Sequence, residues 1–312
     1  MNISIPICFY PTQKIILDDD QDFSKSMILK MHGKNIMAFD SPSIALNYLL
    51  NEYTPYLSKS DLMISDNEAA NSSTQHTVKI NIEKLKQVFM HTACDDLSVL
   101  LIDYHMPEMC GLDFLKQIQH LPIKKALITG EKDYTIAVNA FNDGLVDAYV
   151  RKSDVDFPDK IKNIIQDLEW KYFTDMSRLL AEIPNQTFSY LGNKYFVHAF
   201  QKFIKENDVV KFCLTHMQGN FFTQTKKSLN KYFLIRTKSQ LAEIALSAKE
   251  DGASSQVVQS ISEGKVIPFF NDNEFWQVPA DQWDDYLYFA NEITNEADLV
   301  WTIVDSEQKA KI

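Results

Sequence analysis

The chain has 312 residues, of which 45% are hydrophobic and 12% aromatic, enough for about two domains with packed cores. Its formal net charge of −11 at pH 7 disfavours binding of the whole chain to nucleic acid or to an anionic membrane surface. No apolar stretch approaches the about 18 residues of a membrane-spanning helix, and the first residues lack the pattern of a signal peptide. The four cysteines are scattered without metal-ligand spacing. We therefore expect a cytoplasmic protein with reduced thiols and no membrane partner.

The first half of the chain alternates short apolar runs with segments of helical periodicity. This alternation predicts an α/β fold with a doubly wound, five-stranded parallel sheet of the flavodoxin-like kind. Asp20 suits the start of the first helix, and Ser41 or Ser43 suits the start of the second. The expected strands cover residues 14–17, 35–38, 99–102, 126–129 and 148–151, and the expected helices cover 24–32, 41–50, 111–120 and 133–143.

Polar residues follow four of these expected strands. Asp18 and Asp19 come after the first strand, Asp103 after the third, Thr129 ends the fourth, and Lys152 follows the fifth. The carboxyl ends of parallel strands meet at one edge of a sheet, where ligands bind. A run of aspartates is by itself usually a solvated turn, and a single lysine or threonine at a strand end is usually structural. The ordered combination is what indicates a site.

The run Asp-Tyr-His-Met-Pro-Glu-Met-Cys-Gly-Leu (103–112), together with this order of strand ends, resembles the receiver domain of two-component response regulators. The resemblance covers roughly residues 12–170. It implies that a sensor histidine kinase phosphorylates Asp103. It also implies a Mg²⁺ ion bound by Asp18, Asp19, Asp103 and the backbone carbonyl of His105.

Elementary electrostatics agrees with that implication. Acidic side chains would repel a phosphoryl group, and a hard divalent cation that takes oxygen ligands removes the conflict. Lys152 supplies a further positive charge for a phosphoryl oxygen. The resemblance implies that Thr129 and the small Gly130 contact the phosphoryl group, and that Thr129 and Tyr149 form a switch pair. A plain half-buried strand tyrosine is the alternative for Tyr149.

The resemblance further implies a readout surface at about residues 133–170, which is a common dimerisation face, so we expect a homodimer on phosphorylation. One departure from the family pattern follows Lys152, where Ser153 stands in place of the usual proline. This change puts the rigidity of the loop after Lys152 in doubt.

A long insertion interrupts the receiver pattern. Asp19 and Asp103 are 84 residues apart, about 40 more than in typical receivers. We assign the insertion to residues 52–96. Residues 65–76 are polar and small, which indicates a flexible loop, and residues 81–94 return to helical periodicity. The segment is either a passive surface elaboration or a contact for a partner.

The sequence predicts three parts: a receiver domain at 12–155, an extended linker or signalling helix at 156–184, and an atypical output domain at 185–312. Helical spacing continues from residue 155 to 182 and stops before Pro184. A core helix followed by a second helix explains this spacing equally well.

The output region is expected to be a mixed α+β domain. Residues 209–216 and 221–224 flank a turn and predict a β-hairpin. Further strands are expected at 231–236, 266–270 and 300–304, and helices at 239–250 and 254–263.

Charge divides the output region. Residues 194–238 hold nine Lys or Arg and two acids, while residues 239–312 hold four lysines and fourteen acids. Aromatic residues interleave the basic part, either as core residues or as a surface on which bases stack. No enzymatic motif stands out in this region, so whether the output is an enzyme stays open, although receivers catalyse their own phosphorylation and dephosphorylation.

The segments 232–245, 251–255 and 264–270 resemble the unusual output region of response regulators in quorum sensing. The resemblance implies an output that acts otherwise than by ordinary promoter binding. Two alternatives stay open: a receiver-gated enzyme that binds or processes a nucleotide, and a regulator that binds RNA or protein.

Overall fold

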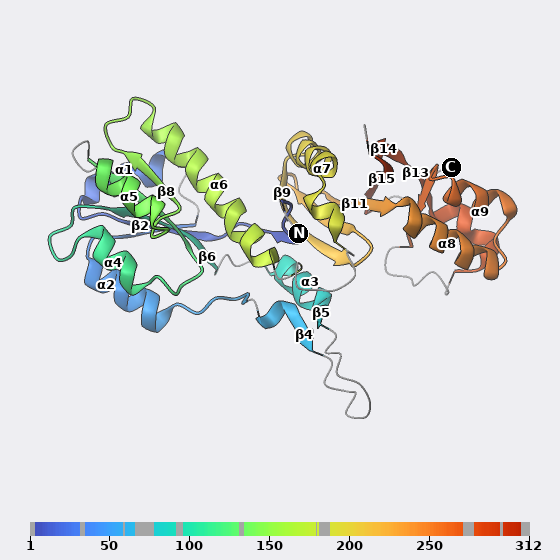
Figure 1. Cartoon of the computed structure of the whole chain (residues 1–312), viewed down its shortest axis with the longest axis horizontal. Helices are drawn as coiled ribbons and strands as arrows, with labels where there is room; N and C mark the ends of the chain where they lie inside the picture. Colours follow the sequence, from blue (N-terminus) through green and yellow to red (C-terminus); the bar gives the residue numbers. More distant parts are fainter. Residues whose placement is uncertain are drawn as a thin grey trace. The chain divides into compact units, whose positions relative to one another are not determined.

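The computed structural model describes residues 4–31, 35–58, 60–65, 78–91, 96–130, 134–178, 180, 188–270, 278–293 and 296–306. The chain forms two compact units (Figure 1). One, here called the receiver unit, comprises Tyr10–Asp61 and His91–Ser177. The other, here called the output unit, comprises Met1–Phe9, Leu62–Met90 and Arg178–Ile312. No helix of the described residues has the length and apolarity needed to cross a membrane.

The receiver unit is built on a five-stranded parallel sheet in the order β3-β2-β6-β7-β8. Every residue of the central strand β6 is buried, as expected for a parallel strand covered on both faces. The doubly wound parallel sheet predicted from the sequence is thus confirmed. Its strands are β2 (Gln13–Leu17), β3 (Ile36–Phe39), β6 (Leu97–Asp103), β7 (Lys124–Thr129) and β8 (Ala148–Arg151).

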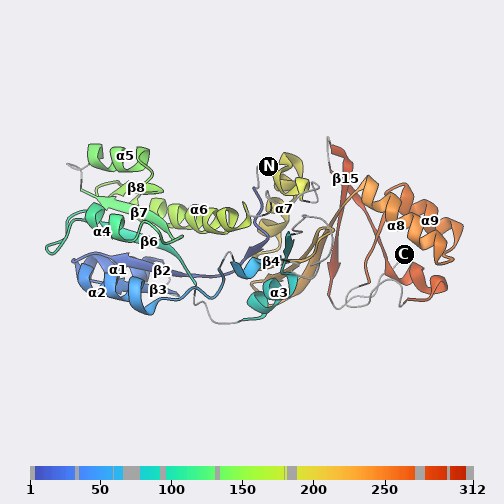
Figure 2. The ribbon, with the colours of Figure 1, turned by 60° about the horizontal axis from the view of Figure 1, so that its bottom comes forward.

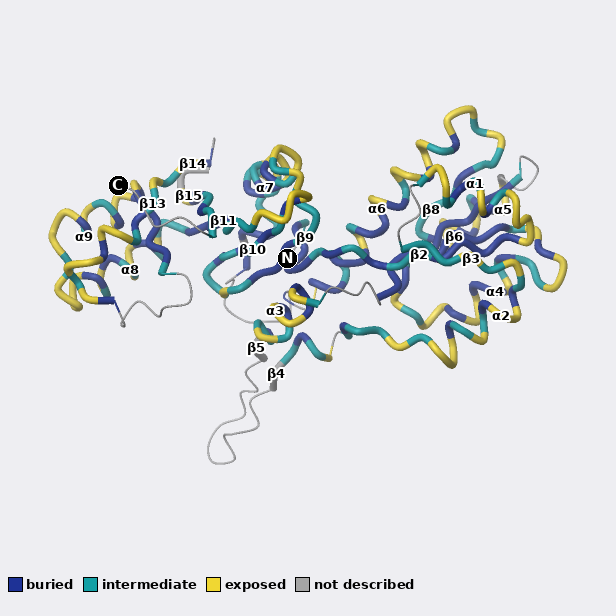
Figure 3. Tube along the Cα trace, turned by 180° about the vertical axis from the view of Figure 1, so that it is seen from behind, coloured by how far each residue is buried: buried dark blue, intermediate teal, exposed yellow. Residues whose placement is uncertain are grey.

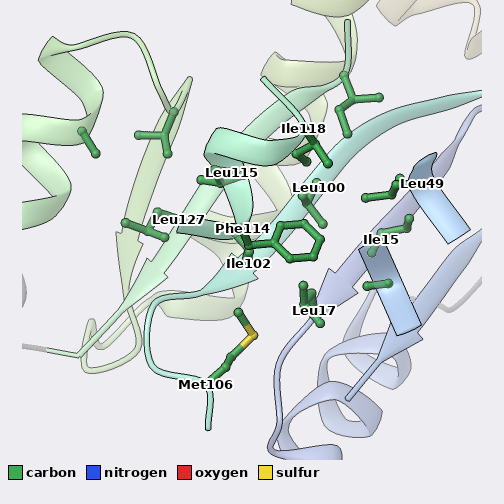
Figure 4. Close-up of a cluster of buried hydrophobic side chains, with 14 of the residues drawn as sticks. Ile15, Leu17, Leu49, Leu100, Ile102, Met106, Phe114, Leu115, Ile118 and Leu127 are labelled. Atoms are coloured by element: carbon green, nitrogen blue, oxygen red, sulfur yellow. The ribbon is translucent and has the colours of Figure 1, made fainter. Parts of the chain in front are cut away.

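Helices cover both faces of this sheet because alternate residues of each strand point to opposite sides. One apolar cluster joins alternate residues such as Ile15 and Ile102 to α2, α4 and α5 (Figure 4). The other cluster joins residues such as Ile16 and Leu101 to α1 and α6. The helices are α1 (Gln21–Lys30), α2 (Pro42–Asn47, continued by a π-helical turn at Tyr48–Glu52), α4 (Gly111–Gln117), α5 (Tyr134–Asn142) and α6 (Phe157–Ser177).

Two predicted helix caps are present. The Asp20 carboxylate accepts hydrogen bonds from the backbone amides of Asp22 and Phe23, so it caps α1. Ser41, and not Ser43, is the cap of α2, where its hydroxyl accepts from the amide of Ile44.

The long helix α6 belongs to the receiver unit and is not a free linker. Its apolar face contributes Ile161, Ile165 and Leu168 to the core beneath the sheet. On the same helix, the buried Glu169 accepts hydrogen bonds from the Thr12 amide, the Thr12 hydroxyl and the Lys14 ammonium. The receiver unit therefore extends past the expected boundary at 156, because the apolar residues of α6 are buried against its sheet. Pro184 lies outside the described residues.

The output unit contains a six-stranded antiparallel sheet in the order β1-β9-β10-β11-β15-β14. The predicted hairpin at 209–224 is confirmed as β9 and β10. A separate two-stranded sheet pairs β12 (Val266–Pro268) with β13 (Leu287–Phe289). The strands of the large sheet are β1 (Cys8–Phe9), β9 (Val209–His216), β10 (Asn220–Thr225), β11 (Asn230–Thr237), β14 (Asn291–Ile293) and β15 (Glu296–Asp305).

Helices cover both faces of this sheet. Figure 2 shows α7 (Lys194–Glu206) on one side of β15, and α8 (Lys238–Glu250) with α9 (Ser255–Ser262) on the other. Sequence periodicity did not predict α7. Most of the aromatic residues in the basic segment form the core between α7 and the sheet, so the core interpretation is right for them: Phe196, Phe200, Phe203, Phe221 and Phe233.

The insertion at 52–96 is shared between the units. A hairpin of β4 (Met63–Ser65) and β5 (Val78–Ile80) leads into α3 (Ile82–Met90), and all three belong to the output unit. Helix α3 packs on β9, and the Lys211 ammonium donates a hydrogen bond to the carbonyl of Phe89 at 2.7 Å. Residues 62–90 of the insertion therefore belong to the output unit and pack on its sheet. Most of the expected loop at 65–76 lies outside the described residues.

Candidate functional site

Three carboxylates converge at the carboxyl edge of the receiver sheet. Because Leu17 pairs with Ile102, the parallel register brings Asp18, which follows β2, beside Asp103, which ends β6. One carboxylate oxygen from each of Asp18, Asp19 and Asp103 lies within 4.8 Å of the other two. Asp18 is 1% exposed and Asp103 6% exposed, while Asp19 is open to solvent. Within the described ranges, this is the one such group of potential metal ligands.

Lys152 bridges two of these carboxylates. Its ammonium nitrogen lies 2.8 Å from Asp18 Oδ2 and 2.9 Å from Asp103 Oδ1. The Lys152 amide donates to the carbonyl of Thr129, which continues the pairing of β7 with β8 and fixes the lysine at this edge. The ammonium also lies 4.5 Å from the centre of the Phe23 ring, a cation–π contact.

Burial and charge act in opposite directions on the pKa values of this site. Burial raises the pKa of Asp18 above its usual range, although the ion pair with Lys152 offsets part of the effect. Burial by itself would lower the pKa of Lys152, but its hydrogen bonds and ion pairs with Asp18 and Asp103 prevail and raise it. The ammonium is therefore firmly charged at neutral pH.

The turn after β6 holds Asp103 in place. The amide of His105 donates to Asp103 Oδ2 at 3.1 Å, while Lys152 holds the other oxygen. A Cβ atom at Gly111 would lie 2.4 Å from the Asp103 carbonyl oxygen and 3.2 Å from the Cα of Tyr104. The glycine in the sequence run is thus required by the close return of the chain. The metal-binding role of the His105 carbonyl stays a prediction.

Thr129 ends β7 at the same edge. The residue is fully buried, and its hydroxyl oxygen makes no hydrogen bond in the structure. A buried hydroxyl without a partner is unfavourable and is available as a donor to an additional group. Gly130 follows it and is half-buried.

Tyr149 is half-buried on β8, in register with Leu127, with its ring 6.0 Å from that of Phe141 on α5. Its role as a switch residue stays a prediction. The Lys152–Ser153 peptide bond is trans, as are all peptide bonds of the described residues.

The charge balance tests whether a metal fits. Three carboxylates face one ammonium, and two of the carboxylates are buried, so the edge has an excess of negative charge. Such a set of oxygen donors fits a hard divalent cation such as Mg²⁺.

Sequence reasoning missed Phe23, because nothing in the sequence distinguishes an aromatic residue under the lysine from an ordinary core residue of α1.

No protein-family model and no curated protein matches the chain. Among solved structures, the Legionella pneumophila response regulator LqsR is 25% identical, with a TM-score of 0.79 over 100% of this chain and 92% of that one. A CheY-like receiver domain protein from Methanospirillum hungatei is 17% identical, with a TM-score of 0.35 over 53% of this chain and 98% of that one. An adenylate cyclase structure from Rhodopirellula baltica is 17% identical, with a TM-score of 0.37 over 55% and 98%.

The similarity to LqsR extends through both units, and it agrees with the parallel sheet and with the acidic residues and lysine at its carboxyl edge. Across both units the chain therefore resembles a two-component response regulator, with a receiver fold and an output region similar to that of LqsR.

Proposed function

We propose that a sensor histidine kinase phosphorylates Asp103 in a Mg²⁺-dependent reaction, and that this modification switches dimerisation and the output region. The observation that carries the proposal is the position of the Asp103 carboxylate. It lies among the oxygens of Asp18 and Asp19 and forms an ion pair with Lys152.

Each residue of the site has a separate role in the proposed phosphorylation of Asp103. Asp18, Asp19 and Asp103, with the His105 carbonyl, would hold the Mg²⁺ ion, which when bound neutralises negative charge between the carboxylates and an incoming phosphoryl group. Lys152 neutralises a phosphoryl oxygen and already orients Oδ1 of Asp103. The unpartnered hydroxyl of Thr129 donates to the phosphoryl group, and Gly130 leaves room beside it.

The proposed readout runs from Thr129 to Tyr149 and the surface of α5, β8 and α6. Movement of the Thr129 hydroxyl toward the phosphoryl group would free space for the ring of Tyr149, which contacts Phe141 on α5. Ile136 and Phe141 on this helix are 37% and 46% exposed. Exposed apolar side chains on one helix support a homodimer at this surface.

The test uses the full-length chain with a small-molecule phosphodonor, with and without Mg²⁺, followed by measurement of the molar mass in solution. Label should appear on the wild type only with Mg²⁺, and the molar mass should double. Asp103→Asn should take no label, whereas Asp113→Asn, an exposed carboxylate on α4, should behave as the wild type. Label on Asp103→Asn would refute the acceptor, and label without a change of mass would refute dimerisation.

The proposed setting is cytoplasmic quorum-sensing signalling, as the resemblance of the output segments to quorum-sensing regulators implies. A second candidate function, a receiver-gated output that binds or processes a nucleotide, is favoured by one observation. A cavity of about 530 Å³ lies between α7 and the strands β14 and β15, and its lining includes Trp301, Tyr195 and Lys202. This volume suits a small ligand.

The nucleotide alternative is tested by thermal unfolding with a panel of nucleotides. Binding should raise the unfolding temperature of the wild type and not that of Trp301→Leu. An RNA-binding output has less support, because the phenylalanines that would stack on bases form the core instead.

A further inference from the structure

Two cysteines stand directly opposite each other in the output sheet. Cys8 on the edge strand β1 pairs with Cys213 on β9 in antiparallel register. The amide of Leu214 donates to the carbonyl of Ile7 at 2.7 Å, so the ladder bond joins the residue before Cys8 to the residue after Cys213. This pattern marks a non-hydrogen-bonded pair, in which the opposing Cα atoms are about 4.5 Å apart.

This backbone geometry matches what a disulfide requires. Cα atoms of bonded cysteines are about 4.4–6.8 Å apart, and the side chains of directly opposite residues project from the same face of the sheet. No shift of the backbone is therefore needed to join the two sulfur atoms. Both residues are thiols in the structure.

The surroundings of the pair control its reactivity. Cys8 is 2% exposed and Cys213 1% exposed. On its other side Cys213 pairs with Phe222, whose ring packs 5.0 Å from that of Phe89 on α3. Burial raises the pKa of Cys213 to about 12, so little thiolate is present while the sheet stays closed.

Strand β1 is the element that can expose these thiols. It has two residues and lies at the edge of the sheet, so its opening breaks the pairing with one neighbouring strand only. The chain then continues through only three residues to β2, the strand that leads into Asp18. A covalent bond between β1 and β9 would thus fix the start of the segment that enters the receiver unit.

We propose that Cys8 and Cys213 are a site of oxidative modification, where a peroxide converts the two thiols into an intramolecular disulfide that fastens β1 to the output sheet. One cysteine loses its thiol proton and its thiolate attacks an oxygen of hydrogen peroxide; the O–O bond breaks, the departing hydroxide takes up the thiol proton, and a sulfenic acid and one water form. The sulfur of the second cysteine then attacks the sulfenic sulfur, the S–O bond breaks, and a second water leaves. Two thiols are oxidised, and one peroxide is reduced to two waters.

The experiment uses the full-length chain with Cys94→Ser and Cys110→Ser, so that only the proposed pair remains. After treatment with hydrogen peroxide the protein is denatured, and remaining thiols are labelled with a maleimide. Both thiols should disappear together in a monomer, mass spectrometry should find the peptides of Cys8 and Cys213 linked, and a dithiol reductant should restore both. Hydrogen exchange of β1 should slow in the linked form.

Two comparisons make the result decisive. Cys8→Ala in the same background should leave Cys213 with no intramolecular link, and the chain with Cys110 restored should show by its loss of label that the oxidant is active. Mild urea, below the unfolding transition, should speed the link by opening β1. The proposal is overturned if both thiols persist at this urea concentration, if only intermolecular links form, or if the link arises only in the unfolded chain.

Discussion

Asp18 places a nearly fully buried carboxylate next to a single ammonium, and this makes the metal-free site electrostatically costly. The raised pKa means that the folded protein binds the Asp18 proton more tightly than the unfolded chain does. The stabilisation linked to this proton is therefore present at low pH and is lost as the pH rises through the folded pKa.

Asp18→Asn should therefore increase the free energy of unfolding of the metal-free protein at pH 7.5. The gain should shrink as the pH falls below the folded pKa of Asp18, because the wild-type carboxyl is then neutral too. Urea unfolding in the presence of a chelator, at several pH values, measures both effects. Asp113→Asn serves as the exposed control, and an Asp18→Asn variant less stable than wild type at pH 7.5 would contradict the argument.

The buried hydroxyl of Thr129 has no hydrogen-bond partner, which lowers the stability of the folded protein. Thr129→Val keeps the shape and removes the polar group, so the unmodified protein should gain about 1 kcal/mol in free energy of unfolding. The same variant should retain phosphorylation at Asp103 and lose the phosphorylation-dependent change of molar mass. A marked loss of stability on urea unfolding would mean that the hydroxyl has a partner, and normal dimerisation would exclude Thr129 as the switch.

At the scale of elements, the turn between β6 and α4 depends on the absence of one side chain. Gly111→Ala would force a Cβ atom to within 2.4 Å of the Asp103 carbonyl oxygen, which is backbone and cannot move aside without displacing Asp103. We expect a loss of about 2–3 kcal/mol in free energy of unfolding, together with weaker Mg²⁺ binding.

Gly252→Ala is the matched control for this prediction. Gly252 has a φ of +89°, but nothing lies within 4 Å of its Cβ position, so the substitution costs only the backbone strain, about 1 kcal/mol. Equal losses for the two variants, or unchanged Mg²⁺ binding by Gly111→Ala, would show that the turn tolerates the added carbon.

Helix α6 is part of the receiver unit because of what its apolar face contacts. Its sequence pattern fits a signalling helix and a core helix equally, because periodicity reports only that one face is apolar. The buried Glu169, with its bonds to Thr12 and Lys14, and the burial of Ile161 and Ile165 show what that face contacts.

At the scale of the molecule, the chain passes between the two units after Phe9, after Asp61, after Met90 and after Ser177. The output unit therefore incorporates a segment that lies, in sequence, within the receiver. Figure 3 shows buried residues along the strands of each unit, and α3 buries Leu85, Val88 and Phe89. A receiver cut out as residues 12–155 would lose α6 and retain an insertion whose partner is missing.

Phe89 and Met90 are adjacent on α3 and provide a direct test of this arrangement. Phe89 is 3% exposed and packs on Phe222, whereas Met90 is 71% exposed. Phe89→Ala should lower the stability of the output unit by about 3 kcal/mol, and Met90→Ala should change it by less than about 0.5 kcal/mol.

Hydrogen exchange resolved by peptide assigns the effect of these two variants. Faster exchange in β9 and β10 with Phe89→Ala, and unchanged exchange in β6 and β7, is the expected result. Faster exchange in β6 and β7 instead would show that α3 stabilises the receiver unit and would contradict the prediction.

The amino-acid sequence by itself determined the receiver sheet and the residues gathered at its edge. Each strand has an apolar run of the right length, and each of Asp18, Asp103, Thr129 and Lys152 lies at the end of its own strand or directly after it, so local pattern and parallel topology suffice to bring them together. The hairpin of β9 and β10 was predictable for the same reason, since a turn joins neighbouring strands.

Only the tertiary structure decided that residues 62–90 belong to the output unit, what the apolar face of α6 covers, and that Cys8 lies opposite Cys213. These features depend on pairings between segments that are far apart along the chain. Periodicity records that a face is buried, but the identity of the surface that buries it is fixed by packing free energy summed over the whole fold.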